Sequence, residues 1–307
     1  VMRLDGPWDD LIRALPKLGP VMALTRNESC VHEKTGAYDH VDLGAATGVV
    51  LNGAIDLRIF LKHWRHGYAV TELSRGRKLD SLQFFDADGT AIHKIYRTDA
   101  TDYSAWLRLT AQFTAAVQTP LLEPRTVANP LPHLLTDAAV DVQALRDGWR
   151  TMRDGPHEFL DLLRRQRVTR LQAARLAGDE FARPVNNDAV RSTLESARDS
   201  GMPLMVFVAS RGVVQIHAGT VHKVVQTGDW LNVLDADFSL HLRTDHIAES
   251  WVVDKPAQDG PVRSLDLYDA DGMQIMQVFG LRKPNTPQQP QWHALMDGLE
   301  TREHVSA

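Results

Sequence analysis

Short stretches of alternating hydrophobic and polar residues dominate the first third of the chain. Residues 55–64 place four aliphatic side chains at every second position, with polar residues between them. A period of two is typical of a strand with one buried face. Similar runs predict four further strands, at 21–27, 68–73, 79–85 and 91–96. The sequence Asp-Ala-Asp-Gly at 86–89 predicts a hairpin turn between the last two strands.

A second pattern, with apolar residues three and four positions apart, predicts helices. It occurs at 9–18 and at 103–117 in the first third of the chain. Four prolines then fall between residues 120 and 132, which excludes a single regular element there. Beyond them the pattern and the capping residues predict four more helices. One covers 142–152 with Asp141 as its cap, one runs from 156 onward, one follows Thr169 and ends near Gly178, and one covers 188–199.

The strand pattern restarts near Gly201, and it restarts as a copy. Residues 81–89 match residues 264–272 in order, and both segments end in Asp-Ala-Asp-Gly. The recurrence indicates that an antiparallel unit of about 100 residues is duplicated. We therefore predict an α+β fold with two such sheet units, joined by a Pro-rich and helical linker. The predicted segments are 1–118, 119–200 and 201–307. A cleft between a sheet and inserted helices commonly holds a ligand.

Composition narrows the class of protein. The 307 residues are 43% hydrophobic and 24% charged, as in an ordinary globular protein. The net charge of -5 argues against general nucleic-acid binding. A single cysteine, Cys30, excludes an internal disulfide and any cysteine-based metal site, and it fits a reducing compartment. No apolar run is long enough to insert into a membrane. Because the sequence opens Val1-Met2, we expect a trimmed chain.

Several catalytic motifs are missing from the sequence. It has no His-Glu-x-x-His, no Gly-x-Ser-x-Gly, no P-loop and no Gly-x-Gly-x-x-Gly, so zinc protease, hydrolase, ATPase and Rossmann dehydrogenase hypotheses lack their motifs. The Asp-Ala-Asp-Gly turns are not calcium loops. An EF-hand needs glycine at the sixth position and a carboxylate at the twelfth, where this chain has Arg97 and Gly280.

One of the 13 histidines, His157, follows Gly155-Pro156 at the predicted start of a helix. The positive potential of a helix N-terminus disfavours the imidazolium form, so the ring stays neutral near pH 7. Neutral imidazole is an axial ligand of haem iron. The alternative interpretation is an exposed histidine near a helix cap. The sequence alone favours this alternative, and His217 is the next histidine to test.

The second unit offers apolar, aromatic and cationic side chains close together in the predicted sheet. They are Met205, Phe207, Gln277 and Phe279 on predicted strands, Arg282 just past a strand, and Lys255 on a predicted loop. On a strand, residues two apart share a face. Such a set suits a flat apolar macrocycle with acidic groups at its edge. An ordinary sheet face with charged edges is the alternative, which the residues alone favour.

Four segments resemble the HemS-type hemin-degrading and hemin-transport proteins of bacterial haem-uptake systems. They are residues 21–29, residues 154–159 with Leu162-Leu163, residues 230–235 and residues 277–284. The resemblance covers essentially the whole chain, including the duplication. It implies a cytoplasmic protein that binds haem (iron protoporphyrin IX) against the sheet of the second unit.

The resemblance also implies roles for individual residues. The proximal iron ligand falls on His157, and the sheet contacts fall on Met205 and Phe207. The contacts to the haem edge fall on Lys255, Gln277, Phe279 and Arg282, although many family members have tyrosine at the position of Phe279. A distal arginine with a catalytic role falls on Arg65, with Arg58 and Arg97 as alternatives. Members usually carry an additional helical segment before the point at which this chain begins.

The expected function is to accept imported haem and to degrade it by opening the ring and releasing iron. The alternative is a non-enzymatic carrier that delivers haem to a separate haem oxygenase. Expected partners are haem, an electron donor of unknown identity and either a haem ABC importer or a haem oxygenase, without nucleic acid. A module that binds another planar ligand is the third hypothesis.

Overall fold

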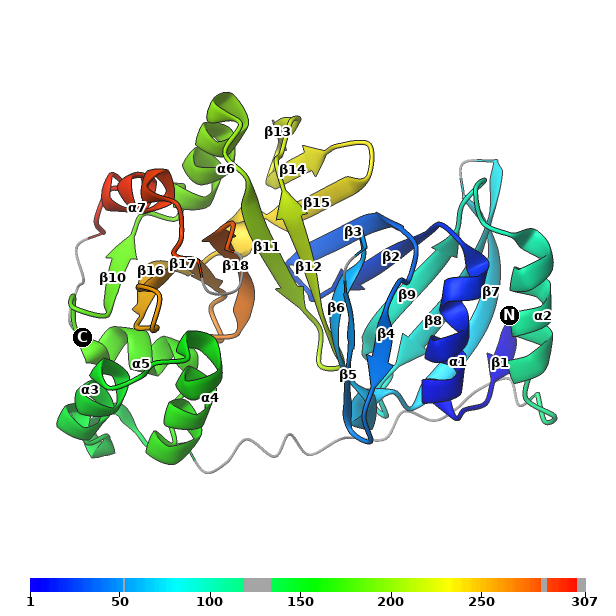
Figure 1. Ribbon diagram of the computed structural model, residues 1–307, viewed down its shortest axis with the longest axis horizontal. Coiled ribbons are helices and arrows are strands. Elements are labelled where there is room, and N and C mark those ends of the chain that lie inside the picture. The colour runs from blue at the N-terminus through cyan, green and yellow to red at the C-terminus, as the bar shows by residue number, and fades with distance from the viewer. Residues whose placement is uncertain (52, 75, 119–133, 283–285, 303–307) are drawn as a thin grey trace. The chain divides into compact units, whose positions relative to one another are not determined.

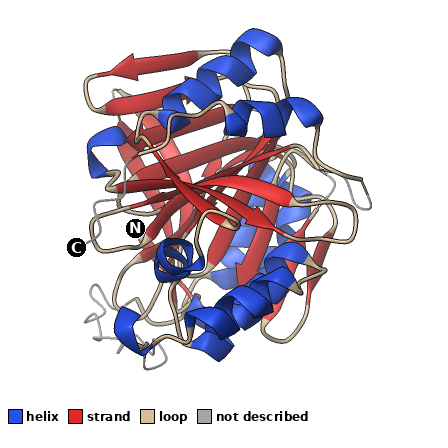
Figure 2. Ribbon diagram, turned by 90° about the vertical axis from the view of Figure 1, so that its left-hand side faces the viewer, coloured by secondary structure: helices blue, strands red, loops and turns tan. Residues whose placement is uncertain are grey.

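A computed structural model describes the 307-residue chain except residues 52, 75, 119–133, 283–285 and 303–307. The predicted proline-rich stretch at 120–132 therefore lies outside the described residues. Helices and antiparallel strands both contribute to the described part, so the predicted α+β class is confirmed (Figure 2). None of the described helices has the length and apolarity needed to cross a membrane.

The chain forms two compact units that do not follow chain order. We call them the first unit and the second unit. The first unit contains residues 1–128, 207–217 and 233–241, and the second contains residues 129–206, 218–232 and 242–307. Strands from the second half of the sequence therefore complete the first unit.

The first unit contains a sheet with the strand order β1-β7-β8-β9-β2-β3-β15 (Figure 1). The bounds are β1 Met2–Leu4, β7 His66–Ser74, β8 Arg77–Phe85, β9 Ala91–Arg97, β2 Val21–Arg26, β3 Cys30–Gly36 and β15 Phe238–Arg243. A second group of strands has the order β12-β6-β5-β4, with bounds Val213–Gly219, Asp56–Phe60, Thr47–Val50 and Val41–Leu43. The helices are α1 Trp8–Ala14 and α2 Tyr103–Phe113.

Two predicted elements of the first unit are shorter than expected. The strand predicted at 55–64 ends at Phe60 and continues as a 3₁₀ turn, Leu61–His63. This turn directs the Trp64 side chain into the core, where its Nε1 donates to the carbonyl of Gly212 at 3.2 Å. The helix predicted at 103–117 ends at Phe113, because Thr114 takes an extended conformation and bridges to β1.

The second unit contains a sheet with the strand order β10-β16-β17-β18-β11 (Figure 1). The bounds are β10 Ala182–Val185, β16 Glu249–Lys255, β17 Val262–Tyr268, β18 Gln274–Gly280 and β11 Leu204–Ala209. Strands β13 Val224–Thr227 and β14 Trp230–Leu234 pair with each other. The helices are α3 Val142–Arg150, α4 Gly155–Gln166, α5 Arg170–Ala177, α6 Ala189–Ser200 and α7 Pro290–Asp297.

Local sequence explains where the linker helices begin. The Asp141 side chain accepts from the Ala144 backbone N–H at 2.9 Å, as its cap position predicts. Thr169 and Gln172 form a reciprocal capping box at the start of α5. Helix α4 differs, because the Asp154 side chain makes no cap bond. The Glu158 carboxylate accepts from the Arg153 and Asp154 backbone N–H groups instead.

Strand pairing confirms the duplication residue by residue. Ser81 pairs with Tyr96 across β8 and β9, and Ser264 pairs with Phe279 across β17 and β18. Each position in β7–β9 corresponds to the position 183 residues later in β16–β18. The irregularity between Phe84 and Phe85 recurs between Leu267 and Tyr268. A bulge kept at the same register in both copies re-aims the same side chains in each.

Helices α3–α5 cover one face of the sheet in the second unit. Trp149 and Phe159 from the helices share a core with Trp251, Val253 and Tyr268 from the strands. The Trp149 and Phe159 ring centroids are 4.5 Å apart. Fully burying one large apolar side chain contributes about 1.5–3 kcal/mol, so this contact holds α4 firmly against the sheet.

Candidate functional site

Lys255 is a buried cation on the helix-covered face of the second unit. The prediction that it lies on a loop is wrong, because Lys255 is the last residue of β16 and pairs with Val262. Lys255 is 1% exposed, and its Nζ donates to Ser264 Oγ at 3.0 Å. The same Nζ lies 5.2 Å from the centroid of the Phe159 ring and 5.8 Å from that of Phe279. A desolvated ammonium between two aromatic faces gains cation–π attraction.

A buried carboxylate, Asp266, lies on the same face. Burial lowers the pKa of the Lys255 ammonium, and Asp266 raises it by favouring the charged form. Asp266 Oδ2 accepts from Gln277 Nε2 at 2.8 Å, from Gln274 Nε2 at 3.2 Å and from the Tyr268 hydroxyl at 3.4 Å. Its other oxygen, Oδ1, is buried without a hydrogen-bond partner among the described residues.

The sheet register brings several predicted residues together. Asp266 pairs with Gln277 and Ser264 pairs with Phe279, so Gln277 and Phe279 share one face of β18, as predicted. Arg282 lies two residues past the end of β18, also as predicted, and its guanidinium donates to Asp259 Oδ1 at 2.5 Å. The second unit thus gathers a lysine, an arginine, an amide and aromatic rings.

The two predicted residues of β11 fall in different units. Both Met205 and Phe207 are half-buried and share one face of the strand. Met205 belongs to the second unit and Phe207 to the first. Their predicted contact with a ligand stays a prediction.

His157 is the third residue of α4, at the helix start that its sequence context predicts. Phe159, two residues further along this helix, contacts Lys255. His157 is therefore two residues along the chain from a side chain that contacts the face just described. The side chains of residues 155–157 lie outside the described part of the structure, so iron ligation by His157 stays a prediction.

The three candidates for the distal arginine belong to the first unit and differ in their partners. Arg58 donates to Asp56 Oδ1 and to the Leu57 carbonyl. Arg97 donates to Asp80 Oδ2 at 3.1 Å. Arg65 is exposed, and its guanidinium has no hydrogen-bond or ion-pair partner among the residues that the structure describes. Arg65 is therefore the candidate whose side chain is available.

His217 lies in the core of the first unit. Its Nδ1 is 3.3 Å from Lys34 Nζ, and its ring stacks on Phe238 with centroids 3.8 Å apart. These contacts give His217 a structural role in the core.

Sequence reasoning missed Phe159, Ser264 and Asp266. The alternation along β17 could have placed Ser264 and Asp266 on one face, because they are two residues apart. The strand pattern alone did not show which helix would cover this face. That cover is what buries Lys255 and brings Phe159 to it.

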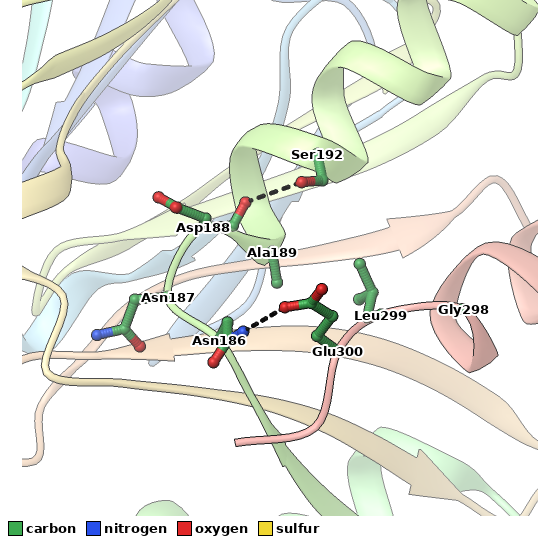
Figure 3. A pocket seen from close by; sticks show the side chains of 8 residues that line it. All are labelled: Asn186, Asn187, Asp188, Ala189, Ser192, Gly298, Leu299 and Glu300. Carbon is green, nitrogen blue, oxygen red and sulfur yellow. Dashed lines mark hydrogen bonds between the residues drawn. The ribbon is translucent and has the colours of Figure 1, made fainter. Parts of the chain in front are cut away.

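A cavity of about 590 Å³ lies elsewhere in the second unit, beside the start of α6 (Figure 3). Its lining includes Asn186, Asp188, Ser192 and Glu300, and no predicted site residue. Asn186 Nδ2 donates to Glu300 Oε2 at 2.8 Å, and Ser192 Oγ donates to the Asp188 carbonyl at 3.3 Å. The polar groups there already bond to one another, so we do not assign the site to this cavity.

Fold and site together define a class: a duplicated α+β protein with an aromatic and cationic sheet face beneath inserted helices. A family model described as "Haemin-degrading HemS.ChuX domain" matches residues 1–113 and 167–299. The chain belongs to the HemS family, which confirms the resemblance noted in the sequence.

Similar proteins of known name support this membership. The chain is 41% identical to the hemin transport protein HmuS of Yersinia pestis and 42% identical to HemS of Yersinia enterocolitica, over 94% of this chain and 83% of each relative. It resembles holo-PhuS, a heme-binding protein from Pseudomonas aeruginosa, with a TM-score of 0.94 and 42% identity over 98% of this chain and 87% of that one. It resembles ChuS, an Escherichia coli heme oxygenase, with a TM-score of 0.87 and 40% identity over 97% and 88%.

Proposed function

We propose that this protein binds haem against the sheet of the second unit and degrades it, opening the ring and releasing iron. Membership of the HemS family supports haem as the ligand. One structural observation carries the proposal. The Lys255 ammonium is fully buried between the rings of Phe159 and Phe279, on the face beneath the helix that carries His157.

The donor set fits the chemistry of haem. The macrocycle is flat and apolar, which suits the aromatic rings of Phe159 and Phe279, and we expect Met205 and Phe207 to extend this contact. Its acidic edge groups suit Lys255 and Arg282 as cations, with Gln277 as a polar neighbour. Bound haem would supply the iron and the ring at which oxygen chemistry takes place. In this proposal His157 supplies the axial nitrogen.

Arg65 is the distal residue in this proposal. An exposed guanidinium without a partner among the described residues can donate hydrogen bonds to a group that develops negative charge. Arg58 and Arg97 are less suitable, because carboxylates already hold them. In this proposal each predicted segment contributes one kind of residue. Segment 201–307 contributes the haem-edge residues, segment 119–200 the axial histidine and segment 1–118 the distal arginine.

A non-enzymatic carrier is the second candidate function. It is favoured by the names of two relatives, which are called hemin transport proteins, whereas a third is called a heme oxygenase. In the cytoplasm, where we propose that the protein acts, a carrier needs an importer as donor and a haem oxygenase as acceptor. The degrading protein needs an electron donor instead. Both functions use the same binding face.

Hemin titration followed by a reductant in air separates the two functions. We expect a Soret shift on binding, then decay of the Soret band with new absorbance from a linear tetrapyrrole. A stable Soret band under the reductant supports the carrier, and a chain that gives no Soret shift with hemin refutes both functions.

Two variants assign roles in the same assay. His157→Ala removes the axial nitrogen, so we expect binding to weaken by about tenfold or more and the Soret maximum to move. Arg65→Ala keeps the binding face, so we expect unchanged affinity and Soret decay slowed by about 100-fold. His222→Ala, which removes an exposed histidine, is the control and should match the wild type. A wild-type spectrum for His157→Ala would refute the ligand assignment.

A further inference from the structure

Asp266 lies in the middle of the candidate site, although no sequence motif indicated a role for it. It is 1% exposed and sits between Trp251 and Gln277 in the strand ladder. Three donors converge on Oδ2, whereas Oδ1 has none among the described residues. Leaving a buried carboxylate oxygen without a donor costs free energy. A charge at this position therefore needs a reason other than its hydrogen bonds.

Lys255 supplies that reason. Its ammonium is buried on the same face, and Ser264 is a neutral partner that cannot balance its charge. Ser264 and Asp266 are two residues apart on the same face of β17, which places the carboxylate beside the partner of the ammonium. Asp266 accordingly raises the pKa of Lys255, whereas Arg170 lowers it. A buried cation without a counter-ion is strongly destabilising, so the pair keeps the charge of Lys255 tolerable when no ligand is bound.

The first repeat has no such pair at the matching positions, all of which are described. The position of Asp266 corresponds to Gln83, which is neutral and donates to Ser81 Oγ at 3.0 Å. The position of Lys255 corresponds to Glu72, which is exposed. The second repeat thus has both the buried lysine and the carboxylate. The first repeat has a neutral amide at the position of the carboxylate.

We propose that Asp266 is the internal counter-ion of Lys255 and a specificity-determining residue for the acidic edge of the ligand. In the empty protein it compensates the ammonium. In the complex it competes with the ligand's acidic group for the Lys255 ammonium, so it limits how tightly an acidic macrocycle is held compared with a neutral one. It also orients the amide of Gln277, a residue of the proposed binding face, by accepting from Nε2. This inference rests on the proposed haem-binding function.

The test compares two ligands on one protein. Hemin carries free carboxylates, and hemin dimethyl ester carries none, so the ratio of their dissociation constants reports the electrostatic preference alone. Asp266→Asn keeps the size and the hydrogen-bond acceptor but removes the charge. We expect it to increase the preference for hemin over the ester by about tenfold, because no buried carboxylate then competes for the Lys255 ammonium. Affinity for the ester should stay within about twofold.

Further variants show whether the effect runs through Lys255. Lys255→Met should abolish most of the preference, and adding Asp266→Asn to it should change the ratio no further. Asp80→Asn, which removes a buried carboxylate from the corresponding strand of the first unit, should leave the ratio unchanged. Asp266→Gln, the residue found at the matching position Gln83, serves if Asp266→Asn fails to fold. Unfolding in urea identifies variants whose fold has changed.

The outcomes distinguish the two hypotheses. Hemin binding by the wild type with an unaltered hemin-to-ester ratio in Asp266→Asn overturns the counter-ion role and leaves haem binding intact. The counter-ion role is equally overturned if the ratio also changes in Asp80→Asn, because the effect would then be a general one of net charge. No binding of hemin by the wild type overturns the proposed function, and the inference fails with it.

Discussion

The two repeats present the same sheet face with different charges. Where the second repeat has Lys255, Asp266, Gln277 and Phe279, the first repeat has Glu72, Gln83, Lys94 and Tyr96, at positions matched by strand pairing. An acidic group at the place of Lys255 repels a ligand's carboxylates, which Lys255 attracts. The duplication therefore supplied two equivalent faces that differ in sign at one matched position, where the second has Lys255 and the first has Glu72.

The difference in burial matters as much as the difference in charge. Helices α3–α5 pack on the second face and share a core with Trp251, Val253 and Tyr268. Lys255 is consequently 1% exposed, whereas its counterpart Glu72 is exposed to solvent. Electrostatic attraction is weak between solvated charges and far stronger where water is excluded. The inserted helices thus bury on the second face a charge whose counterpart on the first face stays in solvent.

The largest expected effect comes from giving one repeat the charged residue of the other at the position of Lys255. Lys255→Glu gives the second face the acidic residue of the first, so we expect hemin affinity to fall by about 30-fold or more, because an attraction becomes a repulsion. Lys255→Met, which only removes the charge, should cost about tenfold. Fluorescence quenching by hemin at constant ionic strength measures both.

The reciprocal change is the control for this exchange. Glu72→Lys alters the exposed face of the first repeat by the same charge, and we expect hemin affinity within about twofold of the wild type. If Glu72→Lys tightened binding as strongly as Lys255→Glu weakened it, net charge rather than the second face would govern binding.

A second expected contrast is in the response to acid. His93 is buried in the first unit, with Nδ1 2.9 Å from Thr25 Oγ1 and Nε2 2.6 Å from the Tyr38 hydroxyl. Burial lowers the pKa of His93 from 6.5 to about 3, and burial also lowers the pKa of His32. The matching positions of the second repeat hold Met276 and Gln215, which do not titrate.

These histidines should make the protein less stable in acid. Above pH 6.5 His93 is neutral in the folded and the unfolded state, so its contribution is complete. Below that pH the unfolded state binds the proton more readily, and stability falls by about 1.4 kcal/mol per pH unit for one such group. Between pH 7 and pH 5 we expect His93 alone to lower the free energy of unfolding by about 2 kcal/mol.

The variant His93→Met isolates this contribution, because it installs the residue of the second repeat. It should lower stability at pH 7 by about 1–3 kcal/mol through its lost hydrogen bonds, yet its loss of stability between pH 7 and pH 5 should be smaller by about 2 kcal/mol. Urea denaturation across this pH range provides the measurement. Equal losses in variant and wild type would show that His93 is not the acid-sensitive group.

Sequence reasoning succeeded where the signal was local or repeated. The Asp141 and Thr169 caps and the Asp-Ala-Asp-Gly hairpins are encoded by a few neighbouring residues, and the copied order of strands revealed the duplication. It failed for Lys255, which a local pattern placed on a loop. Burial of Lys255 depends on Phe159, nearly a hundred positions away, so tertiary contact decides its environment.

Phe279 should give the smallest difference between the repeats. Its counterpart Tyr96 differs from it only by a hydroxyl, and Phe279→Tyr therefore brings the residue of the first repeat to the second face. Because Phe279 is buried close to Lys255, the new hydroxyl can donate to an acidic group at the haem edge, and we expect hemin to bind about two- to fivefold more tightly. Hemin dimethyl ester, titrated in parallel, should gain less. Tyr96→Phe is the matched control and should leave both affinities unchanged, whereas a weaker affinity of Phe279→Tyr for hemin would mean that Phe279 does not border the acidic edge of the ligand.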